Sequence, residues 1–561
     1  MGILEQLKPN AVFHYFEEIC NIPHGSSNTK EISDYCVGFA KQHGLRYIQD
    51  ESNNVIIFKD GTAGYEDLEP VLIQGHLDMV CEKEPDCDID FEKEGLRLAV
   101  RKESVGEGSN EETYVYAEGT TLGADDGIAV AFALAILASD DIMHPPIEAV
   151  FTVDEEIGML GAAAIDCQEL KGKMMLNLDS EEEGFLLVSC AGGVTATCHI
   201  PVERIRVQQN MQTAQNMQAE QNMQAEQNMQ TGQNIQAEQI IQGRLLVTGL
   251  QGGHSGVEID KGRANANQIL GRVLFALKEE MDFEIICVNG GLKDNAIPRE
   301  AYADIVITES ISQNVQQFLK RYNEILANEY RATDANIHLK WCKETKNGIK
   351  ATGETALKQD DESEIKVFDK KSKDAVIAAL VNLPGGIQKM SRDVEGLVQT
   401  SLNLGILKTD EQEVTMSFSV RSSVKTEKEE LVLRLKCLME ALGGTVTCVG
   451  EYPAWEYKKD SKLRDLMIQV YEELYGEGMN HLQSLYGEDV AAGAKRIGKK
   501  PVIQAIHAGV ECGLFAGKIA ELDCVSFGPN IYDIHTPKER LEVSSVQRTW
   551  EYVLEILKRL K

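Results

Sequence analysis

Histidine and carboxylate residues that could hold metal ions occur in four short groups along the first third of the chain. These groups are His76 with Asp78, Asp125 with Asp126, Asp154 to Glu156, and Asp179. Imidazole nitrogen and carboxylate oxygen are the ligands that zinc, manganese and cobalt hydrolases use, whereas structural zinc sites are rich in cysteine. Any one of these residues has a simpler explanation, because an Asp before a helix is usually a helix cap. Four such groups together favour a metal-dependent hydrolase.

Predicted strands would bring these groups to one edge of a sheet. Apolar runs typical of buried strands cover residues 55–58, 71–74, 149–153 and 174–178, and the last three precede ligand groups. A helix of small apolar residues is predicted at 128–138, which gives the βαβ pattern of a mostly parallel sheet flanked by helices. Sites in such sheets form beyond the carboxyl ends of the strands.

A site with two metal ions also needs a carboxylate that bridges the ions and a base that is not a ligand. An Asp at a helix start, such as Asp125, can face both ions. The adjacent Glu155 and Glu156 could divide the roles of ligand and base between them. Other motifs fail: there is no HExxH, and the GxxxxGK spacing that begins at Gly493 lacks the Ser or Thr of a P-loop.

The pattern of polar and apolar residues in the middle of the chain differs from the pattern at its two ends. Polar and apolar residues alternate in 194–200 and 244–247, and helices are predicted at 264–278 and 312–330. This pattern predicts an α+β domain, residues 192–452, inserted into an α/β catalytic domain whose parts are residues 1–191 and 453–561. Between 209 and 242 a hexapeptide of the type QNMQAE recurs. A period of six fits no packed helix, so we interpret the repeat as an expansion within a surface hairpin.

Net charge and cysteine content limit the binding partners and the cellular compartment that are expected for this protein. The chain has 561 residues, with 56 Lys plus Arg against 89 Asp plus Glu, which gives a formal net charge of −33. Such a surface repels nucleic acids and anionic membranes, so neither is expected as a partner. The longest apolar run, 127–138, is shorter than the ~20 residues of a membrane span. The 13 cysteines include no CxxC pair and follow no export signal, which indicates free thiols in the cytoplasm.

Five segments resemble the metal-site segments of the M20 metallopeptidases: IQGHLDMV, TTLGADDGIAVA, FTVDEEIGMLGA, LNLDSEEEG and GPNIYDIHTP. HYFEEICNIPHGSSN, GGHSGVEIDKGRANA, NAIPRE and HAGVECGLF are similar, in order and spacing, to the aminoacyl-histidine dipeptidases (Xaa-His dipeptidases, peptidase D type) of that family. The resemblance covers nearly the whole chain, and the hexapeptide repeat departs from it as an insertion in the lid domain. It implies a cytoplasmic dipeptidase that hydrolyses short peptides, preferentially carnosine-like Xaa-His dipeptides.

The resemblance also implies which residues form the metal site. One metal ion would be bound by His76 and Asp179, the other by Glu156 and His535, with Asp125 bridging and joined to Asp126 by a cis peptide bond. Asp78 would orient His76, and Glu155 would act as the general base. The expected cofactor is two divalent ions, zinc ahead of manganese or cobalt.

In the lid domain the resemblance implies a different set of roles. His254 would reach the scissile carbonyl, and Asn295, Asn403 and Arg421 would bind the substrate, a small peptide. The resemblance leaves open whether the protein forms a homodimer. His507 and Glu511 have the spacing of a helical metal pair, but in the family their segment lies near the site without forming a ligand set.

Two alternatives stay open at this point. The first is a deacylase or tripeptidase of the same family, since substrate specificity depends on the lid domain. The second is a non-catalytic binding protein of the same fold, which would be expected to have lost Glu155 or a metal ligand.

Overall fold

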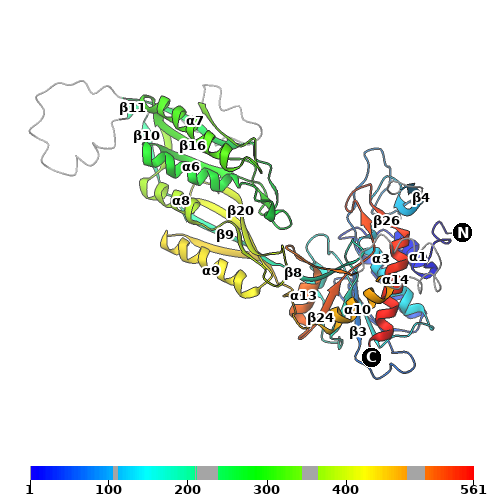
Figure 1. The fold of residues 1–561 in the computed structure, drawn as a ribbon. Helices are drawn as coiled ribbons and strands as arrows, with labels where there is room; N and C mark the ends of the chain where they lie inside the picture. Colours follow the sequence, from blue (N-terminus) through cyan, green and yellow to red (C-terminus); the bar gives the residue numbers. More distant parts are fainter. Residues whose placement is uncertain (1, 105–110, 209, 212–237, 344–363, 477–499) are drawn as a thin grey trace, which may run out of the picture. The chain divides into compact units, whose positions relative to one another are not determined.

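The computed structural model describes residues 2–104, 111–208, 210–211, 238–343, 364–476 and 500–561 (Figure 1). The contacts within these residues divide the chain into two units. The first unit combines residues 1–191 with 453–561, and the second is residues 192–452.

The first unit is built on an eight-stranded sheet in the order β1-β2-β6-β3-β7-β24-β8-β23. The four strands β6, β3, β7 and β24 at its centre are parallel to one another, whereas β1 and β2 join antiparallel at one edge. This confirms the predicted mostly parallel sheet. The strands are β1 (Arg46–Gln49), β2 (Val55–Lys59), β3 (Val71–His76), β6 (Ile147–Thr152), β7 (Met174–Asn177), β8 (Phe185–Cys190), β23 (Val502–Ile506) and β24 (Asp523–Ser526).

Helices cover both faces of this sheet, which is why its strands are apolar without interruption. Val71 and Ile73 of β3 belong to one hydrophobic cluster, while Leu72 between them belongs to another on the opposite face. The first cluster includes α1 (Asn10–Cys20), α2 (Lys30–Gln42), α3 (Ala124–Ala138), α10 (Lys462–Tyr475) and α14 (Val543–Arg559). The second includes α4 (Leu160–Ala164) and α13 (Glu511–Lys518).

A small antiparallel sheet in the same unit joins the two ends of the chain. Its order is β25-β26-β5-β4, with β4 (Leu98–Ser104), β5 (Glu111–Ala117), β25 (Ile531–Tyr532) and β26 (Arg540–Glu542). The loop between β25 and β26 contains His535, so this sheet fixes the late histidine against the early part of the chain.

The second unit contains a ten-stranded sheet whose pairings are all antiparallel. Its strands are β9 (Gly192–Pro201), β11 (Asn210–Met211), β12 (Glu238–Thr248), β14 (Glu284–Gly290), β16 (Ala301–Thr308), β17 (His338–Lys343), β19 (Gly386–Met390), β20 (Val398–Thr409), β21 (Glu413–Ser422) and β22 (Thr445–Tyr452). Figure 1 shows helices beside this sheet, and their apolar residues share one core with it. They are α6 (Ala266–Glu280), α7 (Ser312–Glu329), α8 (Lys370–Asn382) and α9 (Lys425–Ala441).

Most of the hexapeptide repeat lies outside the described residues. Near its start β11 pairs with the first residues of β12, Asn210 opposite Gln239. The expectation of a hairpin between the flanking segments is wrong for β10 (Arg204–Gln208), which pairs with β18 (Glu364–Phe368). Strand β12 pairs with β16 along one edge and with β11 and β17 along the other, which leaves no room beside it for the five residues of β10. Residues 238–242, counted with the repeat in the sequence, belong to β12.

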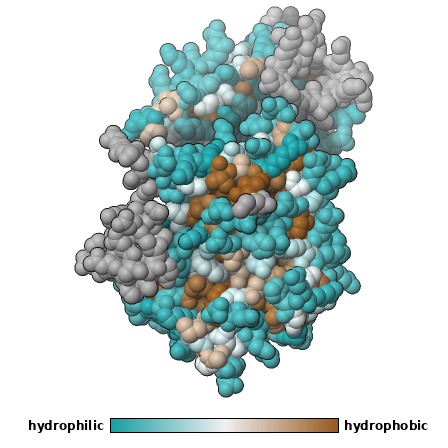
Figure 2. All heavy atoms as spheres, turned by 90° about the vertical axis from the view of Figure 1, so that its right-hand side faces the viewer, coloured by the Kyte–Doolittle hydropathy of each residue, from teal (hydrophilic) through white to brown (hydrophobic). Residues whose placement is uncertain are grey.

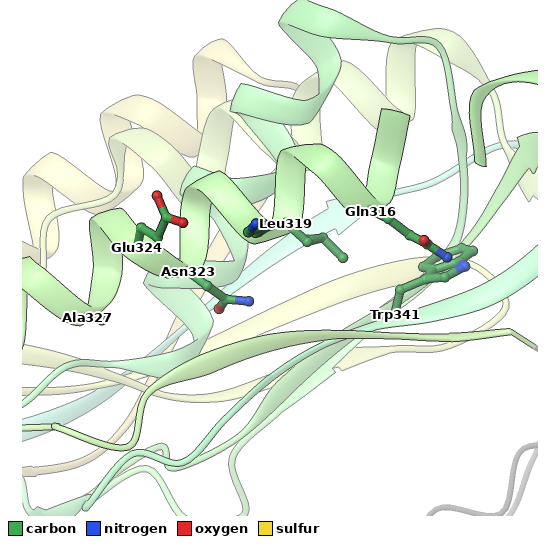
Figure 3. A pocket seen from close by; sticks show the side chains of 7 residues that line it. Gln316, Leu319, Asn323, Glu324, Ala327 and Trp341 are labelled. Atoms are coloured by element: carbon green, nitrogen blue, oxygen red, sulfur yellow. The ribbon is translucent and has the colours of Figure 1, made fainter. Parts of the chain in front are cut away.

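The surface is mostly polar. Figure 2 shows a face covered largely by hydrophilic residues, with hydrophobic side chains gathered in a few places. In the part of the chain that the structure describes, none of the helices has the length and apolar character needed to cross a bilayer. In the second unit, an open groove of about 610 Å³ runs along α7, between residues such as Leu319 and Asn323 and the indole of Trp341 in β17 (Figure 3).

Candidate metal centre

His76 is the last residue of β3 and only 1% exposed. Its Nδ1 lies 2.9 Å from the backbone carbonyl oxygen of Asp78. Because a carbonyl can only accept, Nδ1 carries the proton and the lone pair of Nε2 is available to a metal ion. Nε2 lies 3.2 Å from Asp125 Oδ1 and 3.9 Å from Asp179 Oδ1.

Asp125 stands at the start of α3, where the backbone departs from helical geometry and the peptide bond to Asp126 is cis. Its two carboxylate oxygens face different histidines. Oδ1 is 3.2 Å from His76 Nε2, and Oδ2 is 3.2 Å from His535 Nε2. The structure therefore brings one carboxylate between two imidazoles that are 459 positions apart in the chain (535 − 76). The carboxylate of Asp126 accepts the backbone N–H of His76 at 3.1 Å.

The segment after β6 supplies the two adjacent glutamates. Glu156 Oε1 lies 3.1 Å from His535 Nε2, on the same histidine that faces Asp125. The backbone N–H groups of Glu155 and Glu156 donate to the carboxylate of Asp78 at 3.0 and 3.4 Å. Asp78 thus ties the end of β3 to the end of β6, and the hydroxyl of Ser26 donates to it at 2.8 Å.

Among the described residues, two groups have ligand atoms close enough to share an ion. One is His76, Asp125 and Glu156, and the other is His76, Asp126 and Asp179. Their nitrogen and oxygen atoms all lie within 4.8 Å of one another, which suits ions with ligand distances of about 2.0–2.2 Å. The donor set of imidazole and carboxylate therefore fits zinc or a similar divalent ion.

The electrostatics of the cluster show an excess of buried negative charge. Burial raises the pKa of Glu155 to about 8, with Glu511 and Glu156 adding to the effect. Burial, followed by Asp126, raises the pKa of Asp179 well above its usual range. Hydrogen bonds to Asp125 and Glu156 raise the pKa of His535 to about 10. A divalent ion held by these side chains would offset this negative charge.

The candidate substrate residues of the second unit cluster around one pair of short strands. His254 is in β13 (Gly253–His254), which pairs with β15 (Ala296–Ile297) directly after Asn295. Its Nδ1 accepts the backbone N–H groups of Gly256 and Val257 at 3.1 and 3.2 Å. The proton is therefore on Nε2, and burial together with the charge of Arg421 lowers the pKa of His254.

The other three candidates differ in exposure. Asn295 is exposed. Asn403 is buried and donates to the carbonyl oxygens of Asp294 and Ala296, at 3.0 and 2.9 Å, so it holds the backbone beside β15. Arg421 donates to the hydroxyl of Tyr452 at 3.0 Å, and its Nε has no hydrogen-bond partner among the described residues.

Comparison with known proteins decides the family. The chain is 33% identical over 560 residues to the cytosol non-specific dipeptidase of Escherichia coli (strain K12), covering 100% of this chain and 99% of the relative. A solved aminoacylhistidine dipeptidase from Vibrio alginolyticus is 32% identical with a TM-score of 0.79, covering 99% of this chain and 97% of that one. Residues 247–334 match the family model of a peptidase dimerisation domain.

The chain belongs to the dipeptidases of the M20 metallopeptidase family. As a member it is a hydrolase that acts on peptide bonds, which confirms the predicted fold class and enzyme class.

The structure of this M20 dipeptidase also contains a residue that sequence reasoning missed. Glu539 is 3% exposed and accepts three consecutive backbone N–H groups, from Leu122 at 2.9 Å, Gly123 at 3.3 Å and Ala124 at 2.9 Å. These amides directly precede Asp125, and Glu539 follows His535 by four residues. A glutamate in the segment HTPKE was the only signal in the sequence.

Glu511 has a structural place in this M20 dipeptidase. It is fully buried at the start of α13, and the side chains of Gln74 and Thr152 donate to it. Neither Glu511 nor His507 is part of the two ligand groups found among the described residues. The negative charge of Glu511 is instead one cause of the raised pKa of Glu155.

Proposed function

We propose that this M20 enzyme hydrolyses dipeptides with a free amino end, preferentially Xaa-His, in the cytoplasm, using two divalent ions, zinc ahead of manganese or cobalt. The observation that carries the proposal is the position of Asp125 between His76 and His535, 3.2 Å from each. A carboxylate with one oxygen toward each histidine is the arrangement that a bridge between two ions requires. The cytoplasmic location rests on the relative named cytosol non-specific dipeptidase and on cysteines that are all free thiols.

For the metal ligands we keep the assignment that the family resemblance implies. His76 and Asp179 would bind one ion and Glu156 and His535 the other, with Asp125 shared. Asp78 acts on His76 through its backbone carbonyl, which fixes the tautomer, and through its carboxylate 3.5 Å from Nδ1. When bound, the ions supply Lewis-acid activation of water and of the peptide carbonyl.

Glu155 is the proposed general base. It is adjacent to the ligand Glu156, yet it belongs to neither ligand group, so its carboxylate is free to take a proton from the attacking water and pass it to the leaving amine. Its backbone is held by Asp78, which limits its movement between these two steps.

His254 and Arg421 have complementary proposed roles toward the substrate. Because Nε2 of His254 carries the proton, it can donate a hydrogen bond to the oxygen of the reacting carbonyl. Arg421 presents a guanidinium, whose fork suits the free carboxylate of a dipeptide. Asn295 is a further contact candidate, whereas Asn403 would act through the backbone that it holds.

The support for Xaa-His specificity is that the Vibrio relative is an aminoacylhistidine dipeptidase, while the relative from E. coli is a non-specific dipeptidase. A panel of Xaa-His, Xaa-Gly and Xaa-Ala dipeptides, tripeptides and acetyl-amino acids, assayed with zinc, manganese or cobalt, separates these cases. Hydrolysis of dipeptides above the other classes supports the proposal. A preference for tripeptides or acetyl-amino acids would replace it with the corresponding family activity.

The test of the base is Glu155→Gln, which keeps the shape of the side chain and removes its proton affinity. We expect kcat to fall by about 10²–10⁴-fold while both ions remain bound. Metal content by mass spectrometry and dipeptide turnover are measured on the same sample. Full activity, or the loss of both ions, contradicts the assignment.

We also propose a homodimer formed through the second unit. The matched dimerisation domain, residues 247–334, includes α6 and α7, and the groove along α7 with Trp341 at its side is open (Figure 3). Sedimentation equilibrium should give twice the 62.1 kDa of one chain. A mass of one chain at micromolar concentration would exclude this dimer.

A further inference from the structure

A cavity of about 760 Å³ lies beside the metal centre, entirely within the first unit. Its walls come from three segments: the loop 25–28 between α1 and α2, the loop 79–92 after β3, and Glu156 with Ile157 after β6. Glu156, a proposed metal ligand, is therefore also a lining residue of the cavity. The volume is in the range of small-molecule pockets, about 300–1,000 Å³.

Backbone hydrogen bonds hold two walls of this cavity together. The N–H of Met79 donates to the carbonyl of His24 at 3.1 Å, and the N–H of Ser26 donates back to Met79 at 3.2 Å. The N–H of Ser27 donates to Asp154, next to Glu155, at 2.6 Å. The cavity is thus preformed, and the early motif HGSSN, for which sequence analysis found no role, builds one of its sides.

Apolar side chains stand in this cavity close to the metal centre. Met79 and Ile89 are buried in its wall, Phe91 is half-buried, and Ile157 is 51% exposed directly after Glu156. An apolar group that covers Ile157 would remove apolar surface from water, which is favourable.

The charged residues of the cavity do not favour binding of the carboxylate end of a peptide. Among the described lining residues Lys83 is the only cation, and its ammonium donates to the backbone carbonyl of Ile89 at 2.7 Å. Asp88 and Asp90 also line the cavity and are paired with Arg97 and Lys93 outside it. The remaining acid of this loop that lines the cavity is Glu92, which is exposed. No free cation is therefore directed into the cavity by these residues to bind a carboxylate.

We propose that this cavity receives the side chain of the amino-terminal residue of the peptide, and that it selects apolar chains over acidic ones. The inference rests on the proposed function, because it assigns one residue of the dipeptide to a place. The volume exceeds that of a single side chain, so apolar residues of different size are accepted. An Asp or Glu at the first position would meet the negative charge of Glu92 and of the neighbouring aspartates.

The experiment uses Glu92→Lys in the full-length, metal-loaded enzyme, with Glu94→Lys as the matched control. Glu94 is also exposed, lies two residues away and changes the net charge equally, but it does not line the cavity. Values of kcat/KM are measured for Leu-His, Phe-His and Asp-His, and for Leu-His, Leu-Gly and Leu-Asp. The first series varies the first residue and the second series varies the second.

We expect the wild type to prefer Leu-His over Asp-His by about tenfold or more, and Glu92→Lys to reduce that ratio at least about threefold, because a like charge becomes an opposite one. Glu94→Lys should leave the ratio unchanged, and the second series should keep its order in both variants. Phe91→Ala should lower kcat/KM for Phe-His more than for Ala-His.

Three results would overturn the inference. A change in the second series but not the first would assign the cavity to the carboxyl-terminal residue. Equal effects of the two Lys variants would show that only the overall charge matters, and no effect of either would show that the cavity is not a subsite. In all three cases dipeptides are still cleaved, so the proposed function stands. A metal-loaded wild type that cleaves no dipeptide overturns both.

Discussion

Replacing Glu539 by glutamine tests whether the segment before Asp125 must be held for metal to bind. The carboxylate of Glu539 accepts from three backbone amides of residues 122–124. A glutamine has one oxygen, so its amide group would place a donor against at least one of these N–H donors. A lost hydrogen bond to a charged group is worth about 1.5–3 kcal/mol.

Part of that loss is offset by the cost of the buried charge. Burial raises the pKa of Glu539 to about 7 despite its three hydrogen bonds, and a neutral glutamine avoids this cost above pH 7. A pKa of about 7 instead of 4.5 corresponds to about 3 kcal/mol at pH 8, which is as large as the lost hydrogen bond. We therefore expect Glu539→Gln to change the free energy of unfolding by less than about 2 kcal/mol at pH 8. We also expect metal affinity to fall about 10–100-fold, as for other residues that orient metal ligands.

A matched control separates the effect on the fold from the effect on the site. Glu148 is 4% exposed and accepts the backbone N–H groups of Lys171 and Gly172, at 3.0 Å. It lies at the amino-terminal end of β6, whereas the proposed metal ligand Glu156 follows the carboxyl-terminal end of that strand. Glu148→Gln should lower the free energy of unfolding by about 1.5–3 kcal/mol through the lost hydrogen bond and leave metal affinity unchanged. Urea unfolding and calorimetric zinc titration of the metal-free variants give both quantities. Equal zinc affinity in the two variants would refute the reasoning.

Three further predictions concern other parts of the chain. Asp125→Ala should lose both ions because the carboxylate faces both histidines, whereas His535→Ala should lose mainly one, and metal content distinguishes the two outcomes. Replacing residues 212–237 by a short Gly/Asn turn should leave dipeptide turnover intact, since loop length changes the closure free energy by only about 0.6 kcal/mol per doubling; lost turnover would contradict this. Burial raises the pKa of Glu551 to about 7, so wild-type stability falls as pH rises from about 4.5 to 7. Glu551→Gln, which keeps the contact with Gln547, should therefore be more stable than wild type at pH 8, by up to about 3 kcal/mol, and should gain little at pH 4.5 in thermal unfolding.

The central sheet and most of the metal cluster could be predicted from the sequence for a physical reason. Strands buried on both faces are apolar without interruption, so β3, β6 and β7 stand out, and parallel strands bring their carboxyl ends to one edge. Residues His76, Glu156 and Asp179 follow these ends. The position of His535 has no such signal, because β25 and β26 are only two and three residues long. The resemblance to a family supplied it instead.

Local details that depend on distant contacts were wrong. The residue types Ser27 and Asn28 favour a cap at the start of the second helix, but α2 begins after Thr29, and the backbone of Ser27 adopts a φ of +68° and donates to Asp154. Thr426 likewise favours a cap for α9, whose cap position is Val424. Partners more than 100 positions away cannot be found from the pattern of neighbouring residues.

The order of the strands has a consequence for synthesis on the ribosome. Strand β24, residues 523–526, lies between β7 and β8, which are made more than 300 residues earlier. At about 5–20 residues per second, the nascent chain spends at least about 15 seconds with its central sheet unfilled and with neither His535 nor Glu539 in place. During that time the chain carries His76, Asp125, Glu156 and Asp179 but no complete second site. If His535 binds the second ion as proposed, every chain that ends before residue 535 lacks one ligand of that ion, and a complete pair of bound ions marks a chain translated past that residue.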